Sequence, residues 1–369
     1  MSQSTSNTRR GSKYLLIGST EAYSGKSTSI LGMVSQFQKQ GIDIAYGKPL
    51  GTYWQNSVGN GGIDSDVKFL ASVLNLKENR LLPTILFLDE PTIQKRILGE
   101  DRLDYRSNLA SRLSAPGDLV LLEGPGTLEE GSLFNLSLPE MADQIDASIV
   151  LVSRFESVLS VHKLVSAKQL LGSRLLGVVL NDVPSEHLES FETTVKPFLE
   201  SRDIAVLGML PRNNLLRSVS VGELVVQLQA EVLCCKERMD LMVESLTIGA
   251  MNVSAATRYF RRGRNMAVVT GGDRSDLQMA ALESSTQCLI LTGHIPPADF
   301  ILSRAEEVEI PVLSVDLDTL TTVEIIDRAF GQVRLHEPIK VQAVQMMAHH
   351  FDMDRLIAKL GLETANALS

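Results

Sequence analysis

Gly25-Lys26-Ser27-Thr28 has the residue types and spacing of a phosphate-binding loop. Backbone N–H groups at the start of a helix can bind phosphate oxygens, because the helix dipole favours negative charge there. In such a loop Gly25 permits close approach of the backbone, Lys26 reaches the terminal phosphates and the Ser27 hydroxyl can coordinate Mg²⁺. The full G-x-x-x-x-G-K-[ST] spacing would place glycine at Thr20, so the motif is incomplete. The expected nucleotide-binding residues here are Thr20, Ser24, Gly25, Lys26, Ser27 and Thr28.

Two carboxylates and a lysine could complete this site. Glu123 ends the apolar run DLVLLEG, at the strand end where open α/β sheets bind ligands, and it could hold Mg²⁺ directly or through water. Alternatively, Glu123 is a strand-end glutamate in solvent. Asp66 opens a helix after a glycine-rich loop, where either Ser65 or Asp66 could instead be a simple helix cap. Lys48 follows the second apolar run and could equally be a solvated strand end.

A second polar turn lies far along the chain. Gly271-Gly272-Asp273-Arg274 follows the apolar run MAVVT and precedes a helical pattern, where Asp273 or Ser275 could cap the helix. Its exposed N–H groups and the Arg274 side chain could receive an anion, or the turn could only connect a strand to a helix. A Thr-Thr pair starts another predicted helix. The candidate regulatory residues are Gly271, Gly272, Asp273, Arg274, Thr321 and Thr322.

Cysteines and histidines do not predict a metal or disulfide site. Cys234, Cys235 and Cys288 give neither an even number for a disulfide framework nor metal-ligand spacing, which favours small buried side chains in a reducing cytoplasm. Adjacent histidines rarely chelate one ion together, so we expect His349-His350 to lie at a solvated helix end.

Short apolar runs alternate with longer amphipathic segments over the first part of the chain. Such runs are typical of strands buried on both faces of a parallel sheet. Together with the intervening helices they predict βαβ crossovers and a doubly wound, mostly parallel α/β domain. The predicted strands are 14–18, 43–47, 118–124, 147–152, 175–181 and 204–210, and the predicted helices are 27–40, 66–75, 94–113, 155–171 and 186–201.

A second, smaller α/β alternation follows a connector that we expect to be mostly helical, at about 213–247. A terminal helical hairpin is predicted at 338–360. In the second alternation the predicted strands are 266–270, 287–293 and 310–315, and the predicted helices are 275–285, 297–307 and 320–330.

Composition excludes two classes of partner. The 369-residue chain has 35 Lys and Arg against 44 Asp and Glu, a formal charge of −9, which argues against binding a nucleic-acid backbone. No apolar run approaches the ~18 residues of a membrane span. The polar residues 1–12 indicate a frayed tail rather than a signal peptide, so we expect a cytoplasmic protein.

The order of motifs resembles the dethiobiotin-synthetase-like branch of P-loop proteins, which includes the N-terminal region of long bacterial phosphotransacetylases. The matching segments are GSTEAYSGKST, KPLGT, DSD, EGPGT, LNDV and GMLPR, within about 13–225. The resemblance implies that the amides around Gly25 and the side chain of Lys26 bind phosphates. It further implies that Ser27, Asp66 and Glu123 surround Mg²⁺, that Lys48 stabilises transferred charge, and that Asn181 and the strand ending in Pro211 lie on the adenine side. Two departures concern the longer loop after Gly18 and the Pro125-Gly126-Thr127 turn, which replaces a tighter glycine run near the family's diamino acid substrate.

The later segment VTGGDRSDLQMAAL, with IGAM, LILTG and DTLTTVEII, resembles a DRTGG domain, although the motif here reads GGDRSD. A P-loop domain followed by a DRTGG domain is the N-terminal architecture of long phosphotransacetylases, and we expect their acetyltransferase domain to be absent from this chain, which stops at Ser369. The expected organisation is a tail at 1–12, a P-loop domain at 13–215, a DRTGG domain with its connector at 216–335 and a helical segment at 336–369.

These observations favour a regulatory protein that binds Mg²⁺ and ATP, with at most slow ATP hydrolysis and without phosphate acetyltransferase activity. Two alternatives remain: an ATP-dependent ligase or carboxylase of the dethiobiotin synthetase type, and a non-enzymatic interaction protein with a vestigial P-loop. Because isologous dimers are the commonest homo-oligomers, we expect a homodimer or higher homo-oligomer, and regulation would also require a partner or effector.

Overall fold

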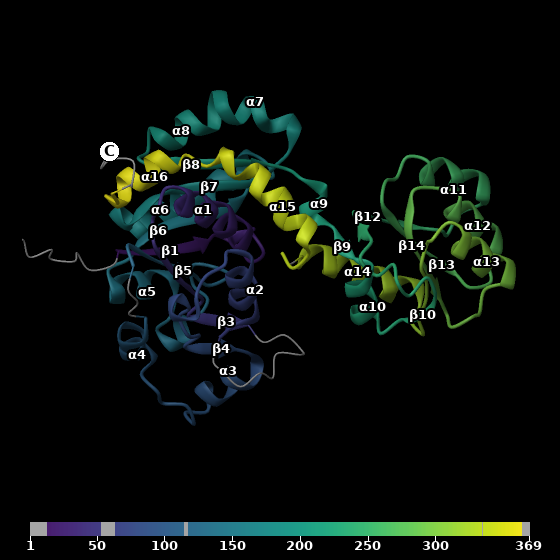
Figure 1. Ribbon diagram of the computed structural model, residues 1–369, viewed down its shortest axis with the longest axis horizontal. Helices are drawn as coiled ribbons and strands as arrows, with labels where there is room; N and C mark the ends of the chain where they lie inside the picture. Colours follow the sequence, from purple (N-terminus) through teal and green to yellow (C-terminus); the bar gives the residue numbers. More distant parts are fainter. Residues whose placement is uncertain (1–12, 53–62, 114–116, 334, 364–369) are drawn as a thin grey trace, which may run out of the picture. The chain divides into compact units, whose positions relative to one another are not determined.

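The computed structural model describes residues 13–52, 63–113, 117–333 and 335–363. The chain forms two compact units (Figure 1). The first unit comprises Met1–Arg212 and Leu335–Ser369, and the second comprises Asn213–Arg334. In sequence, the second unit is therefore inserted between two segments of the first.

The centre of the first unit is a six-stranded sheet in which all neighbouring strands are parallel. In sheet order the strands are β2 (Ile44–Gly47), β5 (Leu119–Glu123), β1 (Lys13–Ser19), β6 (Ser148–Arg154), β7 (Leu175–Val183) and β8 (Val206–Pro211). From β1 the chain first builds one side of the sheet and then crosses over to build the other. Ligands of open α/β sheets bind at the carboxyl ends of the strands where the order reverses in this way, which here is beside β1 and β5.

The strands form where the sequence has continuous apolar runs, because helices cover both faces of the sheet. Leu15, Leu16 and Ile17 of β1 are fully buried, and so are Leu121 and Leu122 of β5. The predicted doubly wound α/β fold is confirmed. A small parallel pair, β3 (Leu50–Thr52) and β4 (Leu86–Leu88), lies outside the main sheet.

The helices of the first unit largely follow the predicted segments, with one correction. The single helix predicted at 94–113 is wrong, because two helices occupy that region. Gly99 follows the first of them with a φ of 76°, and the Asp104 side chain caps the second by accepting a hydrogen bond from the backbone N–H of Ser107. The helices before residue 212 are α1 (Lys26–Lys39), α2 (Ser65–Val73), α3 (Glu90–Ile97), α4 (Tyr105–Arg112), α5 (Leu138–Ile145), α6 (Val161–Leu171), α7 (Leu188–Ser190) and α8 (Lys196–Glu200).

After the second unit, the chain returns to the first as α15 (Pro338–Met347) and α16 (Met353–Leu360), drawn in yellow beside α1 and β8 in Figure 1. Between these helices, Phe351 forms an antiparallel bridge with Gly208 of β8, and the N–H of Asp352 donates to Leu207 O at 2.8 Å. Arg355 of α16 binds both carboxylate oxygens of Glu200 at 2.7 Å. The returning helices are thus part of the packed first unit.

The second unit contains a five-stranded sheet with helices on both faces. Alternate residues of its strands face opposite sides: Leu289 packs with α11, α12 and α13, whereas Ile290 packs with α10 and α14. The strands β12 to β15 are parallel and β10 pairs antiparallel with β15. In sheet order they are β10 (Glu231–Cys234), β15 (Val312–Ser314), β14 (Thr286–Thr292), β13 (Met266–Gly271) and β12 (Ser245–Ile248), and the helices are α9 (Asn214–Arg217), α10 (Val221–Leu228), α11 (Val253–Phe260), α12 (Ser275–Leu282), α13 (Asp299–Glu307) and α14 (Thr319–Gly331).

The mostly helical connector predicted at 213–247 is wrong beyond Leu228. From Glu231 the chain forms β10, β12 and the short pair β9 (Val219–Ser220) and β11 (Met242–Val243). Strands of two to four residues carry too little alternation to be distinguished from a helix in sequence. In the described part of the chain, no helix has the length and apolar character needed to cross a bilayer.

Candidate functional site

The predicted phosphate loop lies at the reversal of strand order, between the end of β1 and the start of α1. Gly25 precedes α1 with a φ of 93°, and among the described residues no side chain caps this helix end. A Cβ at Gly25 would lie 2.1 Å from Asn181 Nδ2, so both the backbone conformation and the close approach require glycine here. An uncapped helix start leaves N–H groups available for an anion.

Lys26 reaches back from α1 to the end of β1. Its Nζ donates to Ser19 Oγ at 2.8 Å, and Ser19 Oγ donates to the carbonyl of Gly126 at 2.8 Å. Burial lowers the pKa of Lys26, although the carboxylate of Glu123 opposes this shift. Lys26 is therefore a buried cation held at the mouth of the loop by a neutral hydroxyl.

Glu123 is not a strand-end residue in solvent, because only 4% of its surface is exposed. Ser27 Oγ donates to Glu123 Oε1 at 3.2 Å, and the hydroxyl of Tyr46 donates to Glu123 Oε2 at 2.9 Å. Burial and then the charge of Glu123 raise the pKa of Tyr46 well above its usual value, so its hydroxyl remains a donor. The carboxylate of Glu123 is thus fixed beside the predicted Mg²⁺ ligand Ser27.

Lys48 is buried between two carboxylates rather than solvated. Its Nζ lies 2.9 Å from Asp66 Oδ2 and 3.3 Å from Asp64 Oδ2. Burial alone would lower the pKa of Lys48, but the charges of Glu123, Asp66 and Asp64 outweigh it and raise the pKa. The helix cap expected at Ser65 or Asp66 is instead Asp64, which accepts from the N–H of Asp66 at 2.8 Å.

Asp66 also has a partner from the far end of the chain. His336 Nε2 lies 3.2 Å from Asp66 Oδ1, and the His336 ring packs against Phe69 of α2 with a centroid distance of 4.9 Å. Sequence analysis missed His336, Tyr46, Asp64 and Ser19. Only Asp64 had a usable signal, as an Asp directly before a helical pattern.

The remaining predicted loop residues lie around Gly25. Asn181 Nδ2 donates to the carbonyl of Ser24 at 2.8 Å, so its amide holds the loop. Thr20, which occupies the place of a glycine, donates to Ser153 Oγ at 2.9 Å. The buried hydroxyl of Ser24 has no hydrogen-bond partner among the described residues. Pro211 ends β8 and pairs with Val183 of β7.

The residues predicted to surround Mg²⁺ are only partly brought together. Ser27 and Glu123 are in contact, whereas Asp66 is bonded to Lys48 and His336. Within the described segments, no three His, Cys, Asp or Glu side chains converge as a metal site. Mg²⁺ often binds through one or two protein oxygens together with phosphates and water, and the Ser27–Glu123 pair fits that kind of site.

The sequence profile of the AAA domain family matches residues 13–220, more than half of the chain. The chain belongs to this family. A DRTGG domain profile matches residues 223–329, so both resemblances found in the sequence are confirmed. The first unit therefore contains the P-loop domain, and the second contains the DRTGG domain.

The matches to similar proteins span most of this chain but a smaller share of each relative's own length. The phosphate acetyltransferase of Nitrosomonas europaea is 23% identical over 94% of this chain and 51% of its own length, and that of Synechocystis is 25% identical over 79% and 43%. The chain spans about half the length of the curated relatives it matches. Among solved structures, septum site-determining protein MinD from Pyrococcus horikoshii, complexed with Mg-ADP, is 16% identical over 56% of this chain and 84% of its own. Its TM-score of 0.33 is too low to support a functional comparison.

In the DRTGG domain, the turn Gly271–Arg274 is held from within. Gln278 of α12 is fully buried, and its Nε2 donates to the carbonyls of Gly271 and Gly272 at 2.9 and 3.0 Å. A Cβ at Gly272 would lie 2.0 Å from the carbonyl oxygen of Ile295, so only glycine fits there. Arg274 donates to Met251 O at 3.2 Å.

The Thr321–Thr322 pair lies at the start of α14, where both hydroxyls take part in the helix cap. Thr321 Oγ1 donates to Asp318 Oδ2 at 2.8 Å, and Thr322 Oγ1 donates to Asp318 O at 2.7 Å. Among the described residues, neither threonine forms a hydrogen bond with the Gly271–Arg274 turn.

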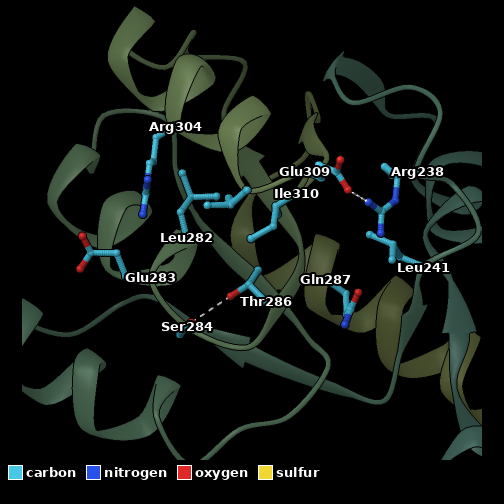
Figure 2. A pocket seen from close by; sticks show the side chains of 11 residues that line it. Arg238, Leu241, Leu282, Glu283, Ser284, Thr286, Gln287, Arg304, Glu309 and Ile310 are labelled. Carbon is cyan, nitrogen blue, oxygen red and sulfur yellow. Dashed lines mark hydrogen bonds and ion pairs between the residues drawn. The ribbon is translucent and has the colours of Figure 1, made fainter.

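A cavity of about 470 Å³ lies elsewhere in the DRTGG domain (Figure 2). Its lining includes residues at the starts of β14 and β15. The Gly271–Arg274 turn follows the end of β13, which is parallel to these strands, so the cavity and the turn lie at opposite ends of the strands. Its two arginines are paired, Arg238 with Glu309 and Arg304 with Glu307. Ser284 and Thr286, also in its wall, share a hydrogen bond of 3.0 Å.

The three cysteines are all free thiols, and all lie in the DRTGG domain. Cys234 and Cys288 are buried, as expected, whereas Cys235 is half-buried. Burial raises the pKa of Cys288 to about 12, so this thiol does not ionise at neutral pH.

Proposed function

We propose that the chain is a regulatory protein whose P-loop domain binds ATP or ADP with Mg²⁺ and whose DRTGG domain responds to the nucleotide state. The observation that carries the proposal is the convergence of Lys26, Ser27 and Glu123 at the reversal of strand order in the sheet. A buried cation, an uncapped helix start and a fixed carboxylate beside a hydroxyl together match the charges of a magnesium nucleotide.

Each residue has a distinct role in the proposal. Lys26 exchanges its hydrogen bond with Ser19 for a phosphate oxygen, and Ser27 with Glu123 holds the Mg²⁺, directly or through water. Bound Mg²⁺ neutralises phosphate charge. Lys48 supplies further positive charge near the phosphates, and Asn181 lies on the adenine side, as the family resemblance implies. Any ATP hydrolysis is slow.

One contact argues against the alternative of a ligase of the dethiobiotin synthetase type. In that family a tight glycine turn helps to hold the diamino acid substrate. Here the N–H of Gly126 in the corresponding turn donates to Glu130 Oε2, so the turn is closed by the chain's own carboxylate. We therefore expect no formation of dethiobiotin from the diamino acid, CO₂ and ATP. We also expect no acetyl transfer between acetyl phosphate and coenzyme A by this 369-residue chain.

The proposal places the protein in the cytoplasm, as a homodimer or higher homo-oligomer that meets a partner or effector through its DRTGG domain. The Gly271–Arg274 turn is the proposed effector site, because it combines an arginine with the start of α12. Three cysteines without a disulfide agree with this compartment.

The decisive experiment is calorimetric titration with ADP and a non-hydrolysable ATP analogue, with and without Mg²⁺. Lys26→Ala should weaken binding about 10- to 100-fold, because a charge-assisted contact to phosphate contributes about 1.5–3 kcal/mol. Lys39→Ala changes an exposed lysine at the other end of the same helix and serves as the matched control. Equal affinities for wild-type protein and Lys26→Ala would refute nucleotide binding at this loop.

A further inference from the structure

The five-stranded sheet of the DRTGG unit has two edge strands, β10 and β12, which differ in their protection. Edge strands of natural proteins usually avoid pairing with other chains through charged side chains, prolines or β-bulges. β10 begins with the exposed Glu231, and its register against β15 shifts between Val232 and Cys234. β12, from Ser245 to Ile248, reads Ser-Leu-Thr-Ile, without charge or proline, and its register against β13 is unbroken. Only β12 therefore has the character of an edge that can accept another strand.

The backbone of β12 has hydrogen-bonding groups on its open side. The N–H of Gly249, directly after the strand, donates to Val269 O of β13 at 2.7 Å. Because alternate residues of a strand direct their backbone groups to opposite sides, the N–H and C=O groups of Leu246 and Ile248 point away from β13. Within the described segments, no other part of the chain forms a backbone hydrogen bond with these groups. The Ile248 side chain is 38% exposed, so a second strand can approach this end of β12.

The surroundings of β12 carry opposite charges at the two ends of the strand. Ser245 Oγ donates to the carbonyl of Arg264 at 3.2 Å, so the loop before β13 lies beside the start of β12. This loop carries three exposed positive side chains, those of Arg261, Arg262 and Arg264. The start of the edge is therefore positively charged.

The other end of the edge is negatively charged. Arg274 donates to Met251 O at 3.2 Å, so the turn that follows β13 lies beside the end of β12. This turn and the start of α12 carry the exposed Asp273 and Asp276, of which Asp276 pairs with Arg274 at 3.3 Å. One negative charge of the pair of aspartates thus remains after this ion pair is counted.

This charge distribution favours a second copy of β12 that runs antiparallel to the first. The positive start of each strand would then lie beside the negative end of the other, whereas a parallel copy would oppose like charges. With the two-fold axis between Leu246 and Thr247, Glu244 would lie opposite Gly249 rather than opposite another carboxylate. Opposite charges across a strand pair stabilise it and like charges destabilise it.

We propose that two copies of this chain associate through the β12 edge, by antiparallel pairing of their β12 strands. This inference rests on the homo-oligomer of the proposed function and names its surface. Addition of a strand to an exposed sheet edge uses main-chain hydrogen bonds for affinity, and a two-fold axis makes the contact the same on both copies. The sheets of two DRTGG units then form one continuous sheet.

The test uses the full chain and measures its self-association by analytical ultracentrifugation. Ile248→Lys places a charge on the edge of both copies, and Ile248→Pro removes an outward N–H while leaving the bonds to β13. Each should raise the dissociation constant about 10-fold or more, because a substitution acts twice in a two-fold contact. Phe300→Lys is the matched control and should associate as wild type, because Phe300 is 55% exposed on α13, which packs against β10 at the other edge. In wild type, hydrogen exchange of residues 245–249 should slow as the protein concentration rises.

Four results would overturn the inference. Wild-type association that persists in both Ile248 variants refutes the interface and leaves the homo-oligomer, and so does exchange of residues 245–249 that is independent of concentration. An equal loss of association in Phe300→Lys also refutes it, because any added charge would then have this effect. A monomeric wild-type chain refutes the proposed homo-oligomer together with the interface. Thermal unfolding checks the fold of each variant, and Ile248→Lys with the exchange measurement decides should Ile248→Pro not fold.

Discussion

Removing one hydroxyl, in Tyr46→Phe, should destabilise the P-loop unit and weaken its response to Mg²⁺. Tyr46 is fully buried and its hydroxyl donates to Glu123 Oε2 at 2.9 Å. Phenylalanine keeps the packing but leaves a buried carboxylate oxygen without this donor. A hydrogen bond to a charged group contributes about 1.5–3 kcal/mol. In a unit of this size, each kcal/mol of lost stability lowers the midpoint of thermal unfolding by about 2–4 °C. The midpoint of Tyr46→Phe should therefore fall by roughly 3–12 °C.

Tyr14→Phe is the matched control, because Tyr14 lies on β1 of the same sheet and donates to a neutral acceptor, Leu113 O, at 3.2 Å. Its loss should cost only about 0.5–1.5 kcal/mol. Scanning calorimetry with and without Mg-ADP measures both quantities. Stabilisation by Mg-ADP should shrink in Tyr46→Phe and remain in Tyr14→Phe. If the two variants unfold together and gain equally from Mg-ADP, the assignment of Tyr46 to Glu123 is wrong.

The same pair of variants gives a prediction for alkaline pH. The pKa of Tyr46 is raised well above its usual value by burial and by the charge of Glu123. A raised pKa contributes stability that is complete below the unfolded-state value of about 10 and is lost as pH rises towards the folded-state value. Wild type should therefore lose stability above about pH 10 more steeply than Tyr46→Phe. Parallel pH profiles of the two proteins would refute this.

Three further predictions concern other parts of the chain. Gly272→Ala should destabilise the DRTGG unit, since its Cβ would lie 2.0 Å from a backbone oxygen, whereas Gly331→Ala, with open space, should be tolerated in thermal unfolding. Arg355→Met should lower the thermal stability of the P-loop unit at neutral pH and make that stability less dependent on pH in the acid range than in wild type: Arg355 lowers the pKa of Glu200, so this pair stabilises the fold at neutral pH and its contribution to wild type disappears as pH falls. Light scattering should find the full chain self-associated, and deletion of 213–334 should abolish this; a monomeric full chain would contradict it.

Local patterns predicted the parts of the fold that depend on nearby residues. The run YLLIG predicted β1 because each residue meets a covered face of the sheet, and the glycine, lysine and serine of the loop lie next to one another in sequence. Lys48 and Glu123 were found for a similar reason, since each stands directly after or at the end of an apolar run. Their burial could not be predicted, because it depends on contacts with other segments of the chain, which an apolar run does not indicate.

The partners that complete the site depend on distant segments. Glu123 is oriented by Tyr46, 77 residues away, and Asp66 is oriented by His336, 270 residues away. Neither contact leaves a period or spacing in the sequence. Tyr46 could be recognised only as an aromatic residue with a polar end inside a buried strand, and His336 has no local signal, because its role arises from the return of the chain after the DRTGG unit.

This return has a consequence for synthesis of the protein. Lys13, at the start of β1, donates to the carbonyl of Gly361 at 2.6 Å, so contacts of the P-loop unit join its first strand to the end of its last helix. The DRTGG unit is continuous in sequence and is complete once Arg334 has been translated. Ribosomes that add roughly 5–20 residues per second need a further few seconds to reach Gly361. The unit that begins first is therefore finished last, and a released chain that ends at Arg334 should carry a protease-resistant DRTGG unit beside a P-loop unit that lacks α15 and α16.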